Sequence, residues 1–188
     1  VGIVLTHAHE DHLGAVADLW PRLGSPVYAT PFAGSVLKRK LGEAGLLETV
    51  PVIEIPLRGP LSLPPFELEL ITMTHSILEP NALAIRTKLG TVFHTGDWKI
   101  DPEPLLGDVT DEAVLRRIGE EGALAMVCDS TNVFVEGQAG SESTVRANIE
   151  KLVRAGRQRV AVTCFASNLA RVESIALAAV AAGRHPVL

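Results

Sequence analysis

A cluster of metal-binding side chains lies near the start of the chain, in residues 6–12. These residues read Thr-His-Ala-His-Glu-Asp-His and directly follow an apolar run at residues 1–5. Imidazole and carboxylate groups hold zinc or manganese at neutral pH. A continuous apolar run is typical of a strand covered on both faces. We therefore expect the chain to leave a strand, turn into a helix and present ligands for two adjacent metals. These candidate ligands are His7, His9, Asp11 and His12.

Two further candidates, His75 and Asp97, each follow a predicted strand. Sites in α/β proteins often gather just past strand ends. Gly96 would let the backbone turn sharply, so that the Asp97 carboxylate points back toward the cluster. His94 faces the opposite way by strand alternation, and we expect it to be a packed histidine rather than a ligand.

Composition indicates an ordinary globular protein. The 188 residues are 47% hydrophobic and 21% charged, and no apolar run is long enough to span a bilayer. The net charge of −5, without a basic run, argues against a dedicated sequence-independent nucleic-acid surface. That argument is weak here, because two bound divalent cations would nearly cancel the charge and place positive charge where a phosphate binds.

The two cysteines, Cys128 and Cys164, lie in apolar, strand-like runs. We expect them to be small buried hydrophobic residues in a reducing compartment, which makes the cytoplasm the expected location. The chain begins inside an apparent strand and stops at the start of another. It is therefore expected to be a segment of a longer protein.

Strand-type and helix-type segments alternate along the chain. Pro21 is expected to stop the first helix, and Asp111 and Ser143 are candidate N-caps. The pattern predicts an α/β fold, with a layered mixed domain in residues 1–110 and a second α/β segment in residues 111–188. Helices are predicted at 13–20, 31–44, 111–121, 143–155 and 167–182, and strands at 1–5, 27–29, 52–55, 66–72, 82–87, 91–95, 123–128 and 158–163.

The same residues resemble a known family. Residues 6–12 look like the H-x-H-x-D-H signature of the metallo-β-lactamase fold, with His75 and Asp97 at the next two ligand positions. Longer blocks are similar to the ribonuclease J branch, whose inserted β-CASP domain distinguishes nucleic-acid-processing members. These blocks are residues 75–87, 94–101, 128–132 and 165–172. The resemblance implies a partial αββα sandwich that lacks its first strands, followed by the start of a β-CASP domain.

The resemblance also implies a site with two divalent metal ions, with Zn²⁺ expected and Mn²⁺ as the alternative. His7, His9 and His75 would hold one metal, Asp11 and His12 would hold the second, and Asp97 would bridge both. Asp11 could also orient the nucleophile. Asp129 matches an acidic residue expected to support the catalytic site. The family's last ligand histidine would lie beyond Leu188.

The implied function is that of a metal-dependent ribonuclease with 5′-to-3′ exonucleolytic and endonucleolytic action. Two metals roughly 3.5–4 Å apart would lower the pKa of a bridging water for in-line attack on a phosphodiester. The expected partner is single-stranded RNA with a 5′-monophosphate, with no membrane, and the full-length protein is expected to be a homo-oligomer. Two alternatives stay open: a small-molecule hydrolase of thiolesters or lactones, since fold and ligands are shared, and a non-catalytic scaffold of an RNA-degradation assembly.

Overall fold

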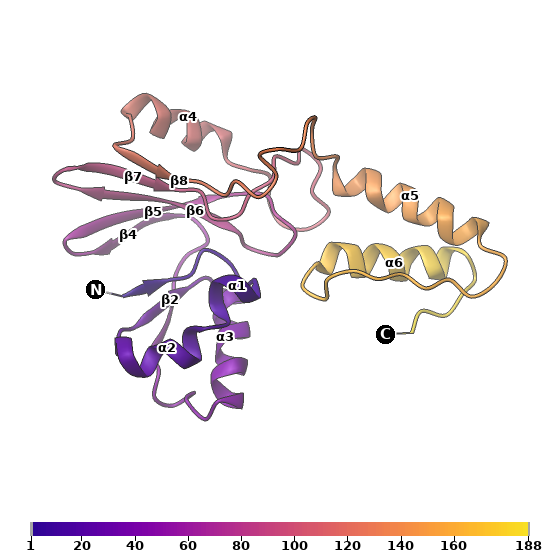
Figure 1. The fold of residues 1–188 in the computed structure, drawn as a ribbon, viewed down its shortest axis with the longest axis horizontal. Coiled ribbons are helices and arrows are strands. Elements are labelled where there is room, and N and C mark those ends of the chain that lie inside the picture. The colour runs from indigo at the N-terminus through magenta and orange to yellow at the C-terminus, as the bar shows by residue number, and fades with distance from the viewer. Residues whose placement is uncertain (1, 188) are drawn as a thin grey trace.

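The computed structural model describes residues 2–187, and its first part is built in four layers (Figure 1). The first sheet has three parallel strands, β1 (Ile3–Val4), β2 (Val27–Ala29) and β3 (Val52–Glu54). The helices that cover it are α1 (Glu10–Leu13), α2 (Val16–Leu23) and α3 (Pro31–Glu43). Leu13, Leu37 and Leu41 are fully buried against Val27, so this helix–sheet contact forms one core.

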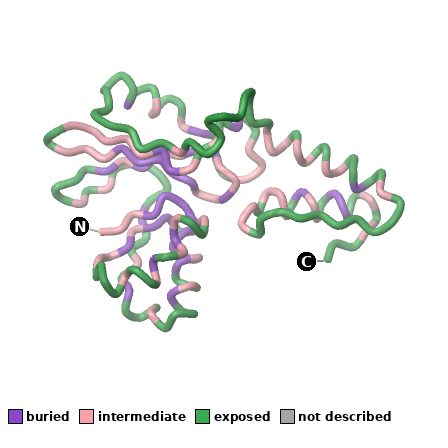
Figure 2. Tube along the Cα trace, in the orientation of Figure 1, coloured by how far each residue is buried: buried purple, intermediate pink, exposed green. Residues whose placement is uncertain are grey.

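The second sheet has five strands, in the order β4-β5-β6-β7-β8. They are β4 (Gly59–Leu63), β5 (Phe66–Thr72), β6 (Asn81–Thr87), β7 (Gly90–His94) and β8 (Ala125–Val127), and only the β7–β8 pair is parallel. Successive side chains of a strand point to opposite faces. Leu70 therefore packs toward the first sheet, whereas Ile71 packs against Ile118 of α4 (Glu112–Glu121). Figure 2 shows the buried residues between these layers.

The second part of the chain is a pair of adjacent helices, α5 (Glu142–Ala155) and α6 (Leu169–Ala181) (Figure 1). Arg146 of α5 donates through Nε to Oγ of the buried Ser174 on α6, at 2.9 Å. The pair lies beside the layered part rather than on top of it. Its attachment to the layers therefore depends on a small number of contacts.

The predicted α/β class and the αββα layering are confirmed, with two sheets between α1–α3 and α4. The predicted bounds of β2 and β5 are matched. β4 was not predicted, because Pro60 interrupts its pattern. Proline is tolerated there because β4 is the edge strand of its sheet.

Several local predictions are wrong. Pro21 does not stop a helix but lies inside α2, which ends at Leu23 and is followed by Gly24 in the left-handed conformation. The cap of α5 is Ser141 rather than Ser143, since the Ser141 hydroxyl accepts the Ser143 backbone N–H. Residues 158–163 form no strand, because they pair with no strand in the described part of the chain.

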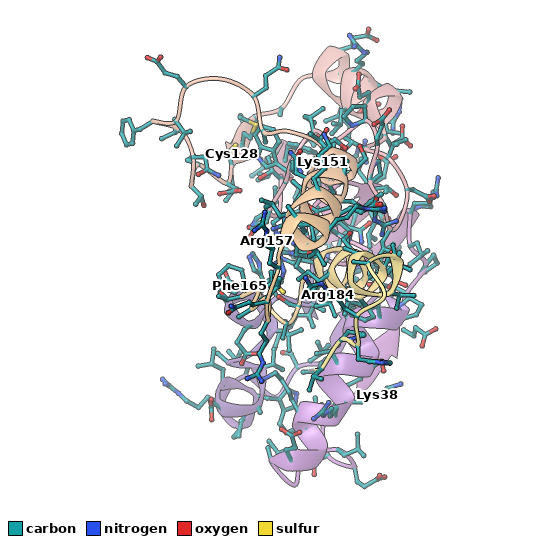
Figure 3. All side chains as sticks on the ribbon, turned by 90° about the vertical axis from the view of Figure 1, so that its right-hand side faces the viewer. Lys38, Cys128, Lys151, Arg157, Phe165 and Arg184 are labelled. Atoms are coloured by element: carbon teal, nitrogen blue, oxygen red, sulfur yellow. The ribbon has the colours of Figure 1, made fainter. Side chains whose placement is uncertain are left out.

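The cysteine prediction is also wrong. Cys128 and Cys164 are both exposed, and Figure 3 labels Cys128 together with the exposed Phe165. Each cysteine follows a segment that is not covered by another helix or sheet within residues 2–187. Among those residues, no helix combines the length and apolar character that crossing a membrane requires.

α4 and β8 belong to the layered part. β8 pairs with β7 in register Val92 with Ala125, and Ile118 of α4 packs on the five-stranded sheet. The elements expected to open the second segment thus pack on the first one. The division of the longer protein at residue 110 stays a prediction.

Candidate metal centre

The histidine cluster lies where β1 leaves the sheet and the chain enters α1. Asn81 at the start of β6 donates its backbone N–H to the Thr6 carbonyl at 3.0 Å, which joins this turn to the second sheet. His7 is 1% exposed, and its Nδ1 lies 3.1 Å from the Thr6 hydroxyl. That contact orients the ring so that Nε2 points toward the other candidate ligands. Thr6 was not among the predicted site residues, although its position directly before the cluster was a signal for it.

Three histidines and one carboxylate form a first donor group, His7, His9, His75 and Asp97. Nδ1 of His9 lies 3.1 Å from Nε2 of His7 and 3.0 Å from Nε2 of His75. Oδ2 of Asp97 lies 3.8 Å from the His7 nitrogen and 3.7 Å from the His75 nitrogen. One ligand atom from each residue falls within 4.8 Å of the others, which suits a single ion.

A second donor group shares Asp97 with the first. It consists of Asp11, His12 and Asp97, again with ligand atoms within 4.8 Å of one another. Nε2 of His12 lies 3.1 Å from Oδ1 of Asp97 and 3.6 Å from Oδ2 of Asp11. The two oxygens of Asp97 therefore face different donor groups. The structure brings together all six residues that the sequence analysis selected as metal ligands.

The electrostatics of the first group favour neutral imidazoles. Burial, followed by repulsion from His12, His75 and His9, lowers the pKa of His7 to about 2. Burial also lowers the pKa of His9 and of His75. A neutral ring keeps the lone pair that coordination requires. Neutral imidazoles beside a carboxylate with two separately directed oxygens fit a pair of divalent cations.

Gly96 and His94 shape the turn that presents Asp97. Gly96 adopts φ +58°, and a Cβ added there would lie 2.6 Å from the Asn81 carbonyl oxygen. Glycine is the residue that accepts both conditions. His94 accepts the Gly96 backbone N–H on Nδ1 at 3.0 Å, and it belongs to neither donor group of the described residues. It supports the turn, consistent with the prediction that it is not a ligand.

Asp129, the remaining predicted site residue, lies behind the Asp97 turn and outside both donor groups. Its backbone N–H donates to the Thr95 hydroxyl at 3.0 Å, and its Oδ1 accepts the Thr131 backbone N–H at 2.9 Å and the Thr131 hydroxyl at 2.6 Å. Hydrogen bonds from the Thr131 hydroxyl and backbone, and then from Trp98, lower the pKa of Asp129. Asp129 is thus joined to Thr95, two residues before Asp97. Thr95 was not among the predicted site residues.

The sequence model of the beta-lactamase superfamily domain matches residues 1–115 of this chain. That span contains both sheets up to β7 and every residue of the two donor groups. The chain belongs to the metallo-β-lactamase superfamily. A solved structure has a similar fold over more of this chain than residues 1–115. It is a protein of unknown function from Enterococcus faecalis V583, with a TM-score of 0.66 and 16% identity, covering 94% of this chain and 44% of that one.

Similar sequences within the superfamily are named ribonuclease J. The protein from Sinorhizobium meliloti is 50% identical over 99% of this chain and 33% of its own length. The proteins from Mycolicibacterium smegmatis and Helicobacter pylori J99 are 42% and 41% identical, over 97% and 91% of this chain. This metallo-β-lactamase chain spans about a third or less of the length of these relatives: 33% for the first and second, 25% for the third. The predicted resemblance to the ribonuclease J branch is confirmed.

Proposed function

We propose that this chain is the metal-binding part of a metal-dependent ribonuclease of the ribonuclease J type, which hydrolyses RNA phosphodiesters. The observation that supports RNA as the substrate is the length of chain over which the sequence is similar to a ribonuclease J. The identity of 50% with the ribonuclease J of Sinorhizobium meliloti runs over 99% of the chain, including α5 and α6. A metal centre alone would not separate a nuclease from a thiolester or lactone hydrolase, since the fold is shared by many chemistries.

The site residues take the roles that their positions support. His7, His9 and His75 are proposed to hold one ion, Asp11 and His12 the other, and Asp97 both. When bound, such a pair of ions supplies an activated water and stabilises charge on phosphate oxygens. Zinc is the proposed ion, because a set rich in imidazole suits it, with manganese as the second choice. Asp129 is proposed to hold the Asp97 turn in place.

The remaining parts of the proposal concern the longer protein. Its substrate is proposed to be single-stranded RNA with a 5′-monophosphate, cut both from that end and internally. The proposed location is the cytoplasm, and the proposed assembly is a homo-oligomer. The names of the relatives support RNA as the substrate class.

The test of the proposed chemistry uses the full-length protein with a 5′-monophosphorylated single-stranded RNA and, in parallel, a thiolester. We expect hydrolysis of the RNA alone. His9→Ala and Asp97→Ala should each lower the rate by more than about a hundred-fold, beyond the loss typical of a group that only supports a ligand. His185→Ala removes an exposed histidine outside both donor groups and serves as the matched control. Retained RNA hydrolysis in Asp97→Ala, or turnover of the thiolester instead, would overturn the proposal.

Metal analysis of the same purified protein tests the ligand set separately. We expect two divalent ions per chain in the unaltered protein and fewer in Asp97→Ala, because both donor groups share that carboxylate. A protein that holds no divalent metal with all six residues intact would favour a scaffold.

A further inference from the structure

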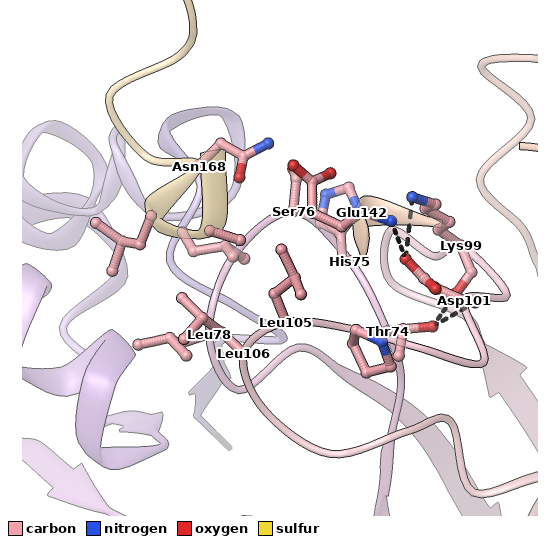
Figure 4. A pocket seen from close by; sticks show the side chains of 14 residues that line it. Thr74, His75, Ser76, Leu78, Lys99, Asp101, Leu105, Leu106, Glu142 and Asn168 are labelled. Carbon is pink, nitrogen blue, oxygen red and sulfur yellow. Dashed lines mark hydrogen bonds and ion pairs between the residues drawn. The ribbon is translucent and has the colours of Figure 1, made fainter. Parts of the chain in front are cut away.

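Asp101 is a buried carboxylate outside both donor groups of the candidate metal centre. It is 5% exposed, and both of its oxygens are occupied. Oδ1 accepts the Glu103 backbone N–H at 3.0 Å, and Oδ2 accepts the Glu142 backbone N–H at 2.9 Å. The Lys99 ammonium lies 3.2 Å from Oδ2 (Figure 4). A buried charge with this many partners is costly to rearrange, because losing one partner leaves the charge unsatisfied.

On one side, Asp101 belongs to the loops that carry two of the candidate metal ligands. Thr74 precedes His75, and its carbonyl accepts the Lys99 backbone N–H at 2.8 Å. The Thr74 hydroxyl donates to the Lys99 carbonyl and accepts the Asp101 backbone N–H at 3.2 Å. These contacts hold the His75 and Asp97 loops together through main-chain groups and the Thr74 hydroxyl. They do not use the Asp101 carboxylate.

On the other side, the Asp101 carboxylate reaches the start of α5. Glu142 is the first residue of α5, where backbone N–H groups have no partner within the helix. The Glu142 side chain continues the connection to α6, since its Oε1 and Oε2 accept from Arg171 at 2.6 and 3.1 Å. The Ser141 hydroxyl adds a hydrogen bond to the Glu103 carbonyl at 2.9 Å. The α5–α6 pair is thereby tied to the loops of the metal centre.

A pocket beside the metal centre is formed by the two parts that Asp101 joins. Figure 4 shows His75 and Ser76 on one side of it and Asn168 on the other. Leu105 and Leu106 complete the wall between them. The distance between the two walls therefore depends on how firmly α5 and α6 are held.

We propose that Asp101 is a positioning residue: its carboxylate fixes the α5–α6 pair against the metal-ligand loops and so sets the shape of the pocket beside His75. RNA that reaches the metal centre would contact that pocket, a step which rests on the function proposed above. Because the carboxylate contacts α5 and not the ligands, its loss should weaken substrate binding while the metals stay in place.

The first experiment compares Asp101→Asn with Asp108→Asn in the full-length protein. The amide introduced by Asp101→Asn would place a donor against a backbone N–H or the Lys99 ammonium. Asp108 undergoes the same chemical change at an exposed position, where its partner is Arg58. We expect Asp101→Asn to raise KM for single-stranded RNA by about ten-fold, the scale of one lost charge-assisted hydrogen bond. Metal content and kcat should stay within about two-fold of the unaltered enzyme, as should all parameters of Asp108→Asn.

The second experiment removes the other end of the hydrogen bond. Glu142→Pro deletes the N–H that Asp101 accepts, yet proline suits the first position of a helix. The preceding Ser141 has φ −74° and ψ 150°, a conformation compatible with a following proline. Glu142→Ala is the matched control, because it also loses the ion pair with Arg171 but keeps the N–H. We expect a higher KM for Glu142→Pro than for Glu142→Ala. Asp101→Asn should raise KM less in the Glu142→Pro background than in the Glu142→Ala background.

The outcomes separate this inference from the proposed function. If the unaltered protein hydrolyses RNA but Asp101→Asn matches it in KM, the positioning role is wrong. Equal effects of Asp101→Asn in both Glu142 backgrounds, or a loss of metal with KM unchanged, would also overturn it. Hydrogen exchange in the first turn of α5 needs no activity: Asp101→Asn should accelerate it and Asp108→Asn should not. If the unaltered protein does not act on RNA, the proposed function fails. The exchange data still test whether the Asp101 carboxylate holds the start of α5.

Discussion

Asp97 is the residue with the most demanding position in the candidate metal centre. Its two oxygens face different donor groups, so a small rotation of the side chain would disturb both. Gly96 fixes the backbone just before it, with a positive φ and a close approach to the Asn81 carbonyl. The geometry of the site therefore depends on a residue that offers no ligand atom.

Gly96→Ala in the full-length protein should lower metal content. The added Cβ would lie 2.6 Å from a backbone oxygen, so the turn must shift and move Asp97. Gly45→Ala is the control: Gly45 also has a positive φ, of +69°, but a Cβ there would have no atom within 4 Å. Metal content by mass spectrometry should fall by half or more in the first variant only. Equal metal content in both variants would contradict this account.

Residue patterns in the sequence were sufficient to select the six donors, because ligand-type side chains recur at strand ends. They could not reveal Asp101, whose partner Glu142 is 41 positions away in sequence. Nor could they reveal the hydroxyl of Thr6 that orients His7. Such contacts depend on how loops from different strands pack together, and the periodicity of neighbouring residues does not predict that packing.

Among the helices and strands, N-cap residues and the alternation of apolar residues predicted the α4 cap and β5 correctly. The Asp111 carboxylate accepts the Val114 backbone N–H at 3.1 Å and caps α4, as predicted. Phe66–Thr72 alternates between faces and forms β5 with the predicted bounds. Residues 158–163 have strand-type residues but no pairing partner among the described residues, which shows that pairing decides where propensity alone does not.

The cap of α4 can be tested by hydrogen exchange. Asp111→Ala removes the acceptor for an N–H of the first turn, which costs about 1 kcal/mol. Exchange of the first-turn amides of α4 should therefore accelerate roughly five-fold. Asp111→Asn should exchange like the unaltered protein, because asparagine caps a helix about as well. If the asparagine variant exchanges as fast as the alanine variant, the charge and not the cap stabilises this end.

Hydrogen bonds of Asp101 and Glu103 with the start of α5 join the four packed layers to the helix pair. Asp101 is central to that junction, and its pKa reports how strongly it is held. Burial raises this pKa, but hydrogen bonds from Ser141, Glu142, Glu103 and Lys99 outweigh burial and lower it from 3.8 to about 2. The ionised carboxylate is therefore favoured in the folded protein.

A pKa lowered by folding stabilises the protein above the ordinary pKa, and this stabilisation is lost as the pH falls toward about 2. The unaltered protein should exceed Asp101→Asn in free energy of unfolding by about 2 kcal/mol at pH 5 and by roughly half of that at pH 3. Urea unfolding of both full-length proteins at the two pH values measures the difference. A difference that stays constant, or widens, as the pH falls would contradict the lowered pKa.

Pro60 on β4 has a consequence for the behaviour of the molecule in solution. β4 is the outer margin of the five-stranded sheet, and an open margin can recruit a strand from another molecule. Proline carries no N–H, and in sheets it is found where the missing donor faces away from the ladder. Pro60, which made β4 hard to predict from the sequence, therefore also protects the folded protein against edge-to-edge aggregation.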